Sequence, residues 1–163
     1  MHDDDALPPE KPGVEFDLEQ FLPYLLNQAA EATSRSFQAT YKAAFGMTRT
    51  QWRVLANLGK FGAMTARDIC SLSHIEKTKV SRAVAGLEAN GALTREISVR
   101  DRRTEILSLT PHGKAVFAQL GAGAVQYDTQ LRAGLGVKSA DILVAVLRDL
   151  IANAAVGSDH GSD

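Results

Sequence analysis

Residues 76–91, EKTKVSRAVAGLEANG, carry four polar side chains whose types suit hydrogen bonding to a ligand: Thr78, Lys79, Ser81 and Arg82. Hydroxyl groups and the amides of a first helical turn suit phosphate oxygens, and lysine or arginine can donate to the O6 and N7 atoms of guanine. Apolar residues recur in the same stretch at the spacing of one helical face: Val80, Val84 and Leu87. The stretch therefore predicts a helix over 77–90 with one buried face and one polar face, which either reads a partner or is simply solvated.

A second basic cluster follows in the segment SVRDRR, with arginines at Arg100, Arg102 and Arg103. The residues around it, ALTREIS and TEILSLT, alternate apolar and polar, which predicts two half-exposed strands joined by a hairpin. Arginine at such a tip is favoured in a narrow minor groove. Phosphates would repel Asp101, so we expect it to pair with a nearby arginine and orient it. A solvated turn is the alternative, because basic runs are common on surfaces.

Two short helices are predicted before the first stretch, each begun by a capping box. Thr48 with Gln51 begins one, and Thr65 with Asp68 begins the next. The apolar residues expected to face inward are Trp52, Leu55 and Leu58 in the first helix and Ile69 and Leu72 in the second. Three helices and a hairpin predict a winged helix-turn-helix, mainly α with a small two-stranded β-wing. In this fold the 77–90 helix would lie in a major groove of DNA.

Long helices are predicted on both sides of this group. One extends from near Pro23 to near Gly46, one is capped by Thr110, and the last is capped by Ser139. The last helix carries a broad apolar stripe: Ile142, Leu143, Val146, Leu147, Leu150 and Ile151. Such a stripe usually packs within its own chain, but here few other long elements are predicted to cover it. A helix of a second chain is therefore a plausible partner.

Basic residues are concentrated in the middle of the chain. The formal net charge is −1, yet residues 32–114 hold 14 of the 18 lysines and arginines and 6 of the 19 aspartates and glutamates. Such a region attracts polyanions, although a solvated surface gives the same count. The N-terminus is acidic where a signal peptide is basic and then apolar, and no apolar run is long enough to span a bilayer. We therefore expect a cytoplasmic protein with no membrane partner.

The run TKVSRAVAGLEANGALTREISVRDRRTEILSLTPHGKAV resembles the MarR family of bacterial transcriptional regulators. It contains the Val-Ser-Arg of the family's recognition helix, the Leu-Glu-x-x-Gly that follows, and the wing signature. The residues at the wing signature's positions are Asp101, Arg103, Leu107, Leu109, Thr110 and Gly113. The layout of about residues 20–155 resembles the family, and residues 48–114 carry the specific motifs. One departure is Glu76, because aspartate is frequent at that capping position.

This resemblance implies an obligate homodimer that binds a near-palindromic double-stranded DNA operator and is released by a small ligand, usually as a repressor. It predicts five parts: 1–15 as a mobile acidic arm, 16–46 as an N-terminal dimerisation helix, 47–114 as the DNA-binding domain, 115–155 as C-terminal dimerisation helices, and 156–163 as a tail. The segments SRSFQATY, MTRTQWRVLANLG and KTKVSRAVAGLE look most like the branch that governs aromatic-acid catabolism. Its effectors are aromatic acids or their CoA thioesters. Candidate ligand-binding residues are Phe37, Tyr41, Arg49, Trp52 and Arg53. No cofactor is implied.

Three other classes of function are alternatives to DNA-binding regulation. Cys70 and His74, four residues apart, could form a redox- or metal-responsive site, but Cys70 is the single cysteine and falls in a helix expected to be buried. A winged helix can also serve as a protein-interaction module without specific DNA binding, although the arginine-rich hairpin argues against this. Catalytic motifs such as a phosphate loop, Gly-x-Ser-x-Gly or His-Glu-x-x-His do not occur, so we do not expect an enzyme.

Overall fold

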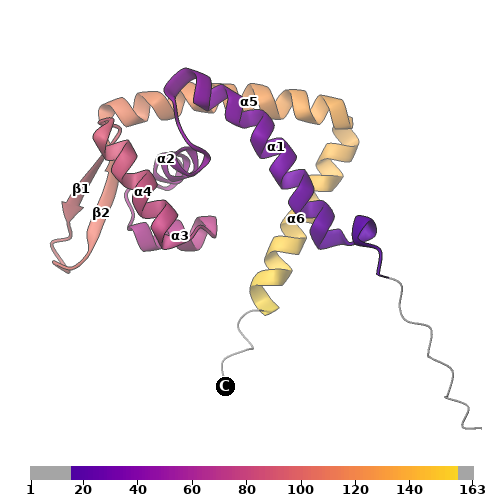
Figure 1. The fold of residues 1–163 in the computed structure, drawn as a ribbon, viewed down its shortest axis with the longest axis horizontal. Helices are drawn as coiled ribbons and strands as arrows, with labels where there is room; N and C mark the ends of the chain where they lie inside the picture. Colours follow the sequence, from indigo (N-terminus) through magenta and orange to yellow (C-terminus); the bar gives the residue numbers. More distant parts are fainter. Residues whose placement is uncertain (1–15, 158–163) are drawn as a thin grey trace, which may run out of the picture. The chain divides into compact units, whose positions relative to one another are not determined.

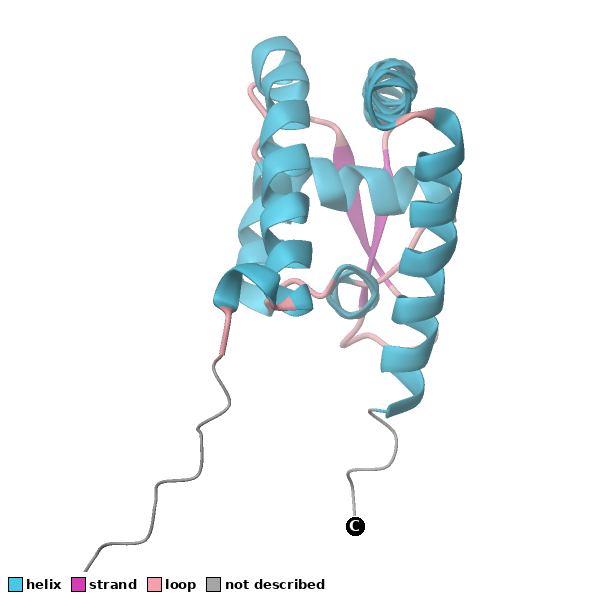
Figure 2. Ribbon diagram, turned by 90° about the vertical axis from the view of Figure 1, so that its right-hand side faces the viewer, coloured by secondary structure: helices cyan, strands magenta, loops and turns pink. Residues whose placement is uncertain are grey.

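The computed structural model describes residues 16–157 of the 163-residue chain. Its elements, in chain order, are a short 3-10 helix Leu18–Gln20, α1 Leu22–Phe45, α2 Arg49–Phe61, α3 Ala66–Ser73, α4 Lys77–Ala89, β1 Leu93–Ile97, β2 Glu105–Leu109, α5 Pro111–Leu135 and α6 Val137–Gly157 (Figure 1). The mainly helical fold with one two-stranded sheet confirms the predicted fold class (Figure 2). The expected arm at 1–15 and residues 158–163 of the expected tail lie outside the described residues.

The chain divides into two units between Ser36 and Phe37. In the described part of the first unit, the Asp17 carboxylate accepts a hydrogen bond from the backbone N–H of Glu19 and caps the 3-10 helix. The rings of Phe16 and Phe21 contact each other edge to face, with centroids 5.4 Å apart. Large apolar side chains of this unit are exposed: Phe16, Leu18, Phe21, Leu22 and Leu25.

Both predicted capping boxes are present in the second unit. The Thr48 hydroxyl accepts from the N–H of Gln51, and the Gln51 amide oxygen accepts from the N–H of Thr48 at 2.9 Å. Thr65 and Asp68 form the same pair of bonds at the start of α3. Each box satisfies N–H groups that have no partner inside the helix, so α2 and α3 begin where their sequences predict.

The core lies where α2, α3, α4, α5 and the sheet meet. Its fully buried side chains include those of Val54, Leu55, Ile69, Val80, Val84, Leu87, Leu93, Leu107 and Leu120. The predicted inward position of Leu72 is wrong, because its side chain is 55% exposed. The buried face of α3 passes through Ile69 and Ser73, and Leu72 lies about 100° around the helix from Ser73.

The two strands pair antiparallel, with Leu93 opposite Leu109 and Ile97 opposite Glu105. A further bridge, which the sequence did not predict, joins Met64 in the α2–α3 connection to Leu107. The N–H of each donates to the carbonyl of the other, at 3.1 and 2.9 Å. This bridge fixes the middle of β2 to the helical group, while the far end of the hairpin extends away from it (Figure 1).

Gly113 lies where the start of α5 meets the residue after Gly91. The Thr110 hydroxyl donates to the Gly91 carbonyl at 2.6 Å and accepts from the Gly113 N–H at 3.0 Å. A Cβ at position 113 would lie 1.9 Å from the backbone oxygen of Ala92. Because backbone cannot yield as a flexible side chain does, this approach requires glycine and gives a physical reason for the glycine of the wing signature.

We expect Gly113→Ala to destabilise the protein by about 1–3 kcal/mol or more, as overpacking does. Gly121→Ala is the matched control, since Gly121 lies in the same helix and has nothing within 4 Å of a built Cβ. The control is expected to stabilise by up to about 1 kcal/mol through helix propensity. Urea unfolding at one protein concentration measures both. Equal effects would contradict the close approach to Ala92.

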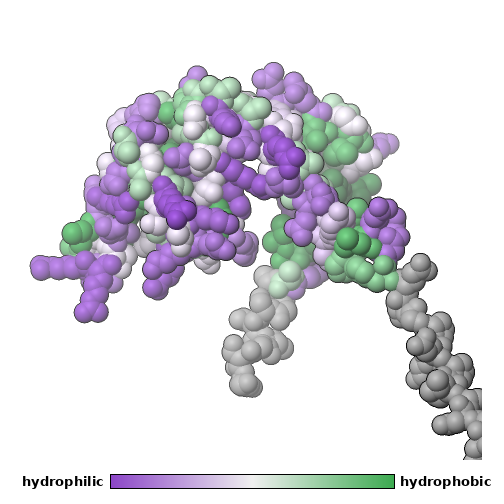
Figure 3. Space-filling model, in the orientation of Figure 1, coloured by the Kyte–Doolittle hydropathy of each residue, from purple (hydrophilic) through white to green (hydrophobic). Residues whose placement is uncertain are grey.

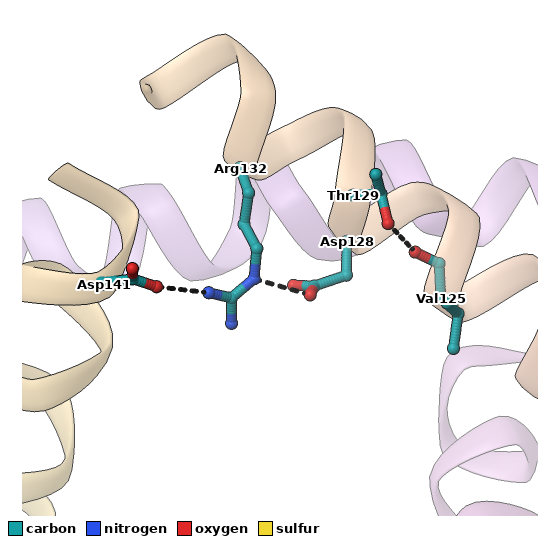
Figure 4. A network of polar contacts seen from close by, with 5 residues as sticks. All are labelled: Val125, Asp128, Thr129, Arg132 and Asp141. Atoms are coloured by element: carbon teal, nitrogen blue, oxygen red, sulfur yellow. Dashed lines mark hydrogen bonds and ion pairs between the residues drawn. The ribbon is translucent and has the colours of Figure 1, made fainter. Parts of the chain in front are cut away.

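A single residue, Gly136 with φ +83°, separates α5 from α6. Ser139 was expected to cap α6, but α6 begins at Val137 and the Ala140 N–H already donates to the Gly136 carbonyl. Arg132 braces this corner: its Nε is 2.7 Å from Asp128 and its guanidinium is 3.3 Å from Asp141 of α6 (Figure 4). Between residues 16 and 157, no helix has both the length and the apolar character needed to cross a bilayer.

Candidate nucleic-acid interface

The polar face of α4 is presented to solvent. Its four predicted contact residues are exposed: Thr78, Lys79, Ser81 and Arg82. The buried stripe on the opposite face, Val80, Val84 and Leu87, packs into the core as predicted. Burial of this stripe sets the rotation of α4 about its axis, and that rotation turns the four polar side chains outward.

α2 packs against α4. A Cβ at Gly86 would lie 2.3 Å from the side-chain nitrogen of Gln51, so the glycine leaves room for this side chain in its capping position. Lys79 and Arg82 border a cleft of about 260 Å³ that is also lined by Thr48, Thr50 and Gln51. This cleft combines two cations with hydroxyl and amide groups, which is suitable chemistry for a phosphate oxygen.

The start of α4 has a weak cap. Glu76 occupies the capping position but makes no side-chain hydrogen bond to the helix, in agreement with the departure noted in the sequence. Its carboxylate instead lies 3.7 Å from the Lys79 ammonium. The first turn of α4 carries no acidic residue, so the carboxylate at the positive end of the helix dipole is that of Glu76.

A polar network from α2 holds the turn between α3 and α4. The Arg53 guanidinium donates to the Ser73 carbonyl at 2.5 Å, and the Asn57 side chain donates to the Ser73 hydroxyl at 2.8 Å. His74 follows in the left-handed conformation, with φ 50°. Burial, and then the positive charge of Arg49, lower the pKa of Arg53. Local sequence patterns do not predict this network, because its partners are 16 and 20 residues apart.

The hairpin tip carries exposed side chains at Arg100, Arg102 and Arg103, and hydrophilic groups project at the far end of the hairpin (Figure 3). Asp101 was expected to pair with an arginine side chain. Its carboxylate instead accepts from the backbone N–H of Arg103 at 3.0 Å and from the Thr104 hydroxyl at 2.7 Å. These bonds lower the pKa of Asp101 and organise the turn from which the arginines project.

Arg95 joins the hairpin to the end of α4. Its Nε lies 2.9 Å from Glu88 of α4, and its guanidinium lies 3.3 Å from Glu105 of β2. The network ties the hairpin to α4 and so fixes the position of the hairpin relative to the polar face of that helix. Glu88 is the glutamate of the Leu-Glu-x-x-Gly motif, so the sequence marks one side of this link. Local periodicity does not reveal that its partner is Arg95.

The candidate ligand-binding residues fall into two groups. Phe37, Tyr41 and Trp52 contact one another, with ring centroids 5.4 to 6.0 Å apart, and Tyr41 is 1% exposed. Burial raises the pKa of the Tyr41 hydroxyl, and the charge of Arg49 opposes that rise. Arg49 and Arg53 instead line a separate cavity together with Lys79. The three aromatic side chains therefore belong to the core or pack against it, whereas the two arginines line a cavity.

Cys70 is partly buried and packs against the core, and the backbone N–H groups of His74 and Ile75 both donate to its carbonyl. The part of the chain that the structure describes contains no group of three or more His, Cys, Asp or Glu side chains placed to hold a metal ion. The backbone carbonyl of Cys70 therefore takes part in ending α3.

Comparison with known proteins agrees with this geometry. The model of the MarR family matches residues 45–104. The MarR family transcriptional regulator SPO1453 from Silicibacter pomeroyi DSS-3 is 30% identical, with a TM-score of 0.74 over 86% of this chain and 99% of that one. BpsR of Bordetella bronchiseptica, whose DNA binding is regulated by 6-hydroxynicotinic acid, is 25% identical, with a TM-score of 0.73 over 83% and 96% of the two chains.

The homoprotocatechuate degradative operon repressor of Escherichia coli is 24% identical over 127 residues, which cover 78% of this chain and 85% of the repressor. SPO1453 is named as a transcriptional regulator, the Escherichia coli relative as an operon repressor, and BpsR as a protein that binds DNA, which agrees with the expectation that the chain is not an enzyme. The identity with SPO1453 over nearly its whole length shows that this chain belongs to the MarR family of transcriptional regulators.

Proposed function

We propose that this protein is a repressor that binds a near-palindromic DNA operator as a homodimer and is released by a small aromatic acid or its CoA thioester. One observation carries the DNA-binding part of this proposal. A recognition helix with four exposed polar residues and a hairpin tip with three exposed arginines belong to one unit, joined through Arg95. Such a role is exercised in the cytoplasm, with the DNA.

Each side chain has a proposed part. Arg82 and Lys79 donate to base edges or phosphates in the major groove, and Thr78 and Ser81 donate to phosphate oxygens. Arg100, Arg102 and Arg103 enter the adjacent minor groove, with Asp101 holding the turn. Residues 47–114 form the DNA-binding domain, and segments 16–46 and 115–155 supply the dimer contacts.

The exposed apolar surface of α6 supports the homodimer. The large apolar side chains of α6 are exposed in the single chain, among them Ile142, Val146 and Ile151, and hydrophobic surface is visible over the lower half of α6 (Figure 3). A two-fold dimer would also present two recognition helices to successive major grooves, about 10 bp apart. One subunit alone would contact only half of a palindromic operator.

The names of two relatives support the effector class. BpsR responds to 6-hydroxynicotinic acid, which is an aromatic carboxylic acid, and the Escherichia coli relative is named for a homoprotocatechuate operon. Such a ligand shifts the equilibrium between DNA-competent and incompetent states only by its difference in affinity for the two.

Salt titration tests the DNA-binding proposal. We expect the affinity for DNA from upstream of the protein's own gene to fall with salt with a log–log slope of about −4 or steeper, since each neutralised phosphate contributes about −0.9. Fluorescence anisotropy between 50 and 200 mM salt, roughly the range over which such losses are large, gives the slope. A protein-interaction module would show no operator binding at any salt concentration in this range.

A further inference from the structure

Two exposed apolar side chains lie on the hairpin between the core and the basic tip. Ile97 ends β1 and is 67% exposed, and Val99, two residues further along, is fully exposed. A hydrophobic area is visible on the hairpin next to its projecting hydrophilic groups (Figure 3). The three arginines proposed to enter the minor groove follow directly in the sequence: Arg100, Arg102 and Arg103. The two apolar residues therefore belong to the same end of the hairpin as the arginines.

Ile97 continues the face of the sheet that packs on the core. Successive residues of a strand point to opposite faces, so Leu93, Arg95 and Ile97 share one face of β1. Leu93 is buried, and Arg95 reaches Glu88 near the end of α4. Ile97 lies beyond that contact and is largely uncovered by residues 16–157. The core face of the hairpin therefore ends in an exposed apolar side chain.

The backbone around Val99 is held by the hydrogen bonds of Ser98. The Ser98 N–H donates to the Thr104 carbonyl at 2.8 Å. The Ser98 hydroxyl accepts from the backbone N–H groups of Arg100 at 3.3 Å and Asp101 at 3.4 Å. Val99 lies in a bend after the end of β1, where strand propensity does not favour a valine. Because its backbone is already ordered, the side chain would lose little conformational freedom on binding.

We propose that Val99, supported by Ile97, contacts the floor of the minor groove and makes the hairpin select A·T over G·C base pairs. The inference rests on the proposed function, in which the arginines of the tip enter this groove. Every base pair presents acceptors there, but only G·C adds a donor, the N2 amino group of guanine. An apolar side chain above that amino group excludes its water and offers no acceptor in return. G·C pairs under the hairpin are therefore disfavoured.

The charge of the arginines has a separate effect that favours the same DNA. Arginine is attracted to a narrow minor groove, which is typical of A·T-rich DNA, because the negative potential is enhanced there. The two effects differ in their salt dependence. Replacing Val99 removes no charge, so the salt slope of DNA binding should not change, whereas the loss of an arginine makes the slope shallower. Selection by Val99 is therefore separable from selection by charge.

The test measures the affinity of the full chain for three duplexes of about 20 base pairs, the length that two successive major grooves require. The first alternates A and T, the second G and C, and the third inosine and C, since inosine lacks the N2 amino group of guanine. Anisotropy at roughly 50 mM salt, where non-specific binding is strong, needs no knowledge of the operator. Wild type should bind the A·T and I·C duplexes about 5-fold or more tightly than the G·C duplex, because a buried donor without an acceptor lowers affinity by about that factor.

Three variants assign this preference to Val99. In Val99→Ser the hydroxyl can accept from the guanine amino group, so the three affinities should become nearly equal while the salt slope stays that of wild type. Val99→Ile keeps an apolar side chain and should keep the preference. Phe61→Ser is the control, since it removes a side chain that is 62% exposed at the end of α2, and it should also keep the preference. Because Val99 is fully exposed, its substitution should leave the midpoint of urea unfolding unchanged.

Three results would overturn the inference alone. Wild type could bind the three duplexes equally, it could bind the I·C duplex as weakly as the G·C duplex, or Val99→Ser could keep the wild-type preference. In the last case the arginines alone would select A·T pairs. Failure of the wild type to bind any of the duplexes would instead refute the DNA-binding function itself, and the inference with it.

Discussion

Replacing Val146 by aspartate is expected to convert the proposed homodimer into monomers and to weaken binding to a full operator by about 100-fold or more. Val146 lies in the apolar stripe of α6, and its side chain is 49% exposed in the single chain. A charge at this position costs the monomer little, because exposed substitutions usually change stability by less than about 0.5 kcal/mol. In an apolar interface the same carboxylate would lose its water without gaining a partner. Operator affinity falls because a dimer contacts both half-sites at once, and two linked contacts bind far more tightly than one.

Ala145→Asp is the matched control, since residue 145 precedes Val146 directly, is exposed, and lies on the other side of α6 from the stripe. It adds the same charge to the same helix and should leave dimers intact. Light scattering coupled to size-exclusion chromatography gives the mass, and anisotropy with full-site and half-site duplexes gives the affinities. If Val146→Asp remained a dimer of wild-type mass, α6 would not be the interface, and its exposed stripe would need another explanation.

The parts of the fold that depend on local rules followed from the sequence. The capping boxes at Thr48 and Thr65, the buried stripe of α4 and the change to a two-residue period after Gly91 all appear in the structure as predicted. Each of these features depends on residues within a few positions of one another. Local hydrogen bonding and periodicity are therefore sufficient to predict the winged helix-turn-helix, but not how its pieces contact each other.

The errors share a cause. Leu72 is spaced three residues from Ile69, as a residue on the same helical face would be, but it lies at the edge of the narrow face that α3 buries. The width of a buried face depends on what packs against it. Ser139 is a good capping residue, yet the left-handed Gly136 starts α6 two residues earlier. The Asp101 carboxylate accepts from a backbone N–H two residues away, whereas a guanidinium was the expected donor. In each case a competing partner decided the outcome.

The largest gap concerned long-range polar contacts. Arg53 with Ser73, Asn57 with Ser73, and Arg95 with Glu88 and Glu105 connect segments that no periodicity relates. These contacts hold the turn before the recognition helix and set the hairpin against its end. The polar residues proposed to touch DNA were therefore identifiable from the sequence, whereas the residues that position them required the structure.

Arg82→Ala is expected to reduce operator affinity about 10- to 100-fold and to relax discrimination against unrelated DNA, because a bidentate base contact contributes about 1–3 kcal/mol. The side chain is exposed on α4 and borders the cleft beside α2, while the core beneath is formed by Val80 and Val84. Removing the guanidinium should therefore leave folding unchanged. Circular dichroism and urea unfolding of the variant check this requirement before any affinity is interpreted.

Comparing Arg103→Ala with Arg82→Ala separates the contribution of base contacts to DNA affinity from the contribution of positive charge. The turn should survive in this variant, because Asp101 accepts from the backbone N–H of Arg103 and not from its side chain. We expect weaker binding to operator and unrelated DNA in nearly equal proportion, because the minor groove offers an arginine little sequence information, and a shallower salt slope, because one cation close to the phosphates is lost. Anisotropy with both duplexes at several salt concentrations gives the two ratios. If Arg82→Ala also weakened both duplexes equally, its contact would be to the phosphate backbone, and sequence would have to be read by the other polar residues of α4.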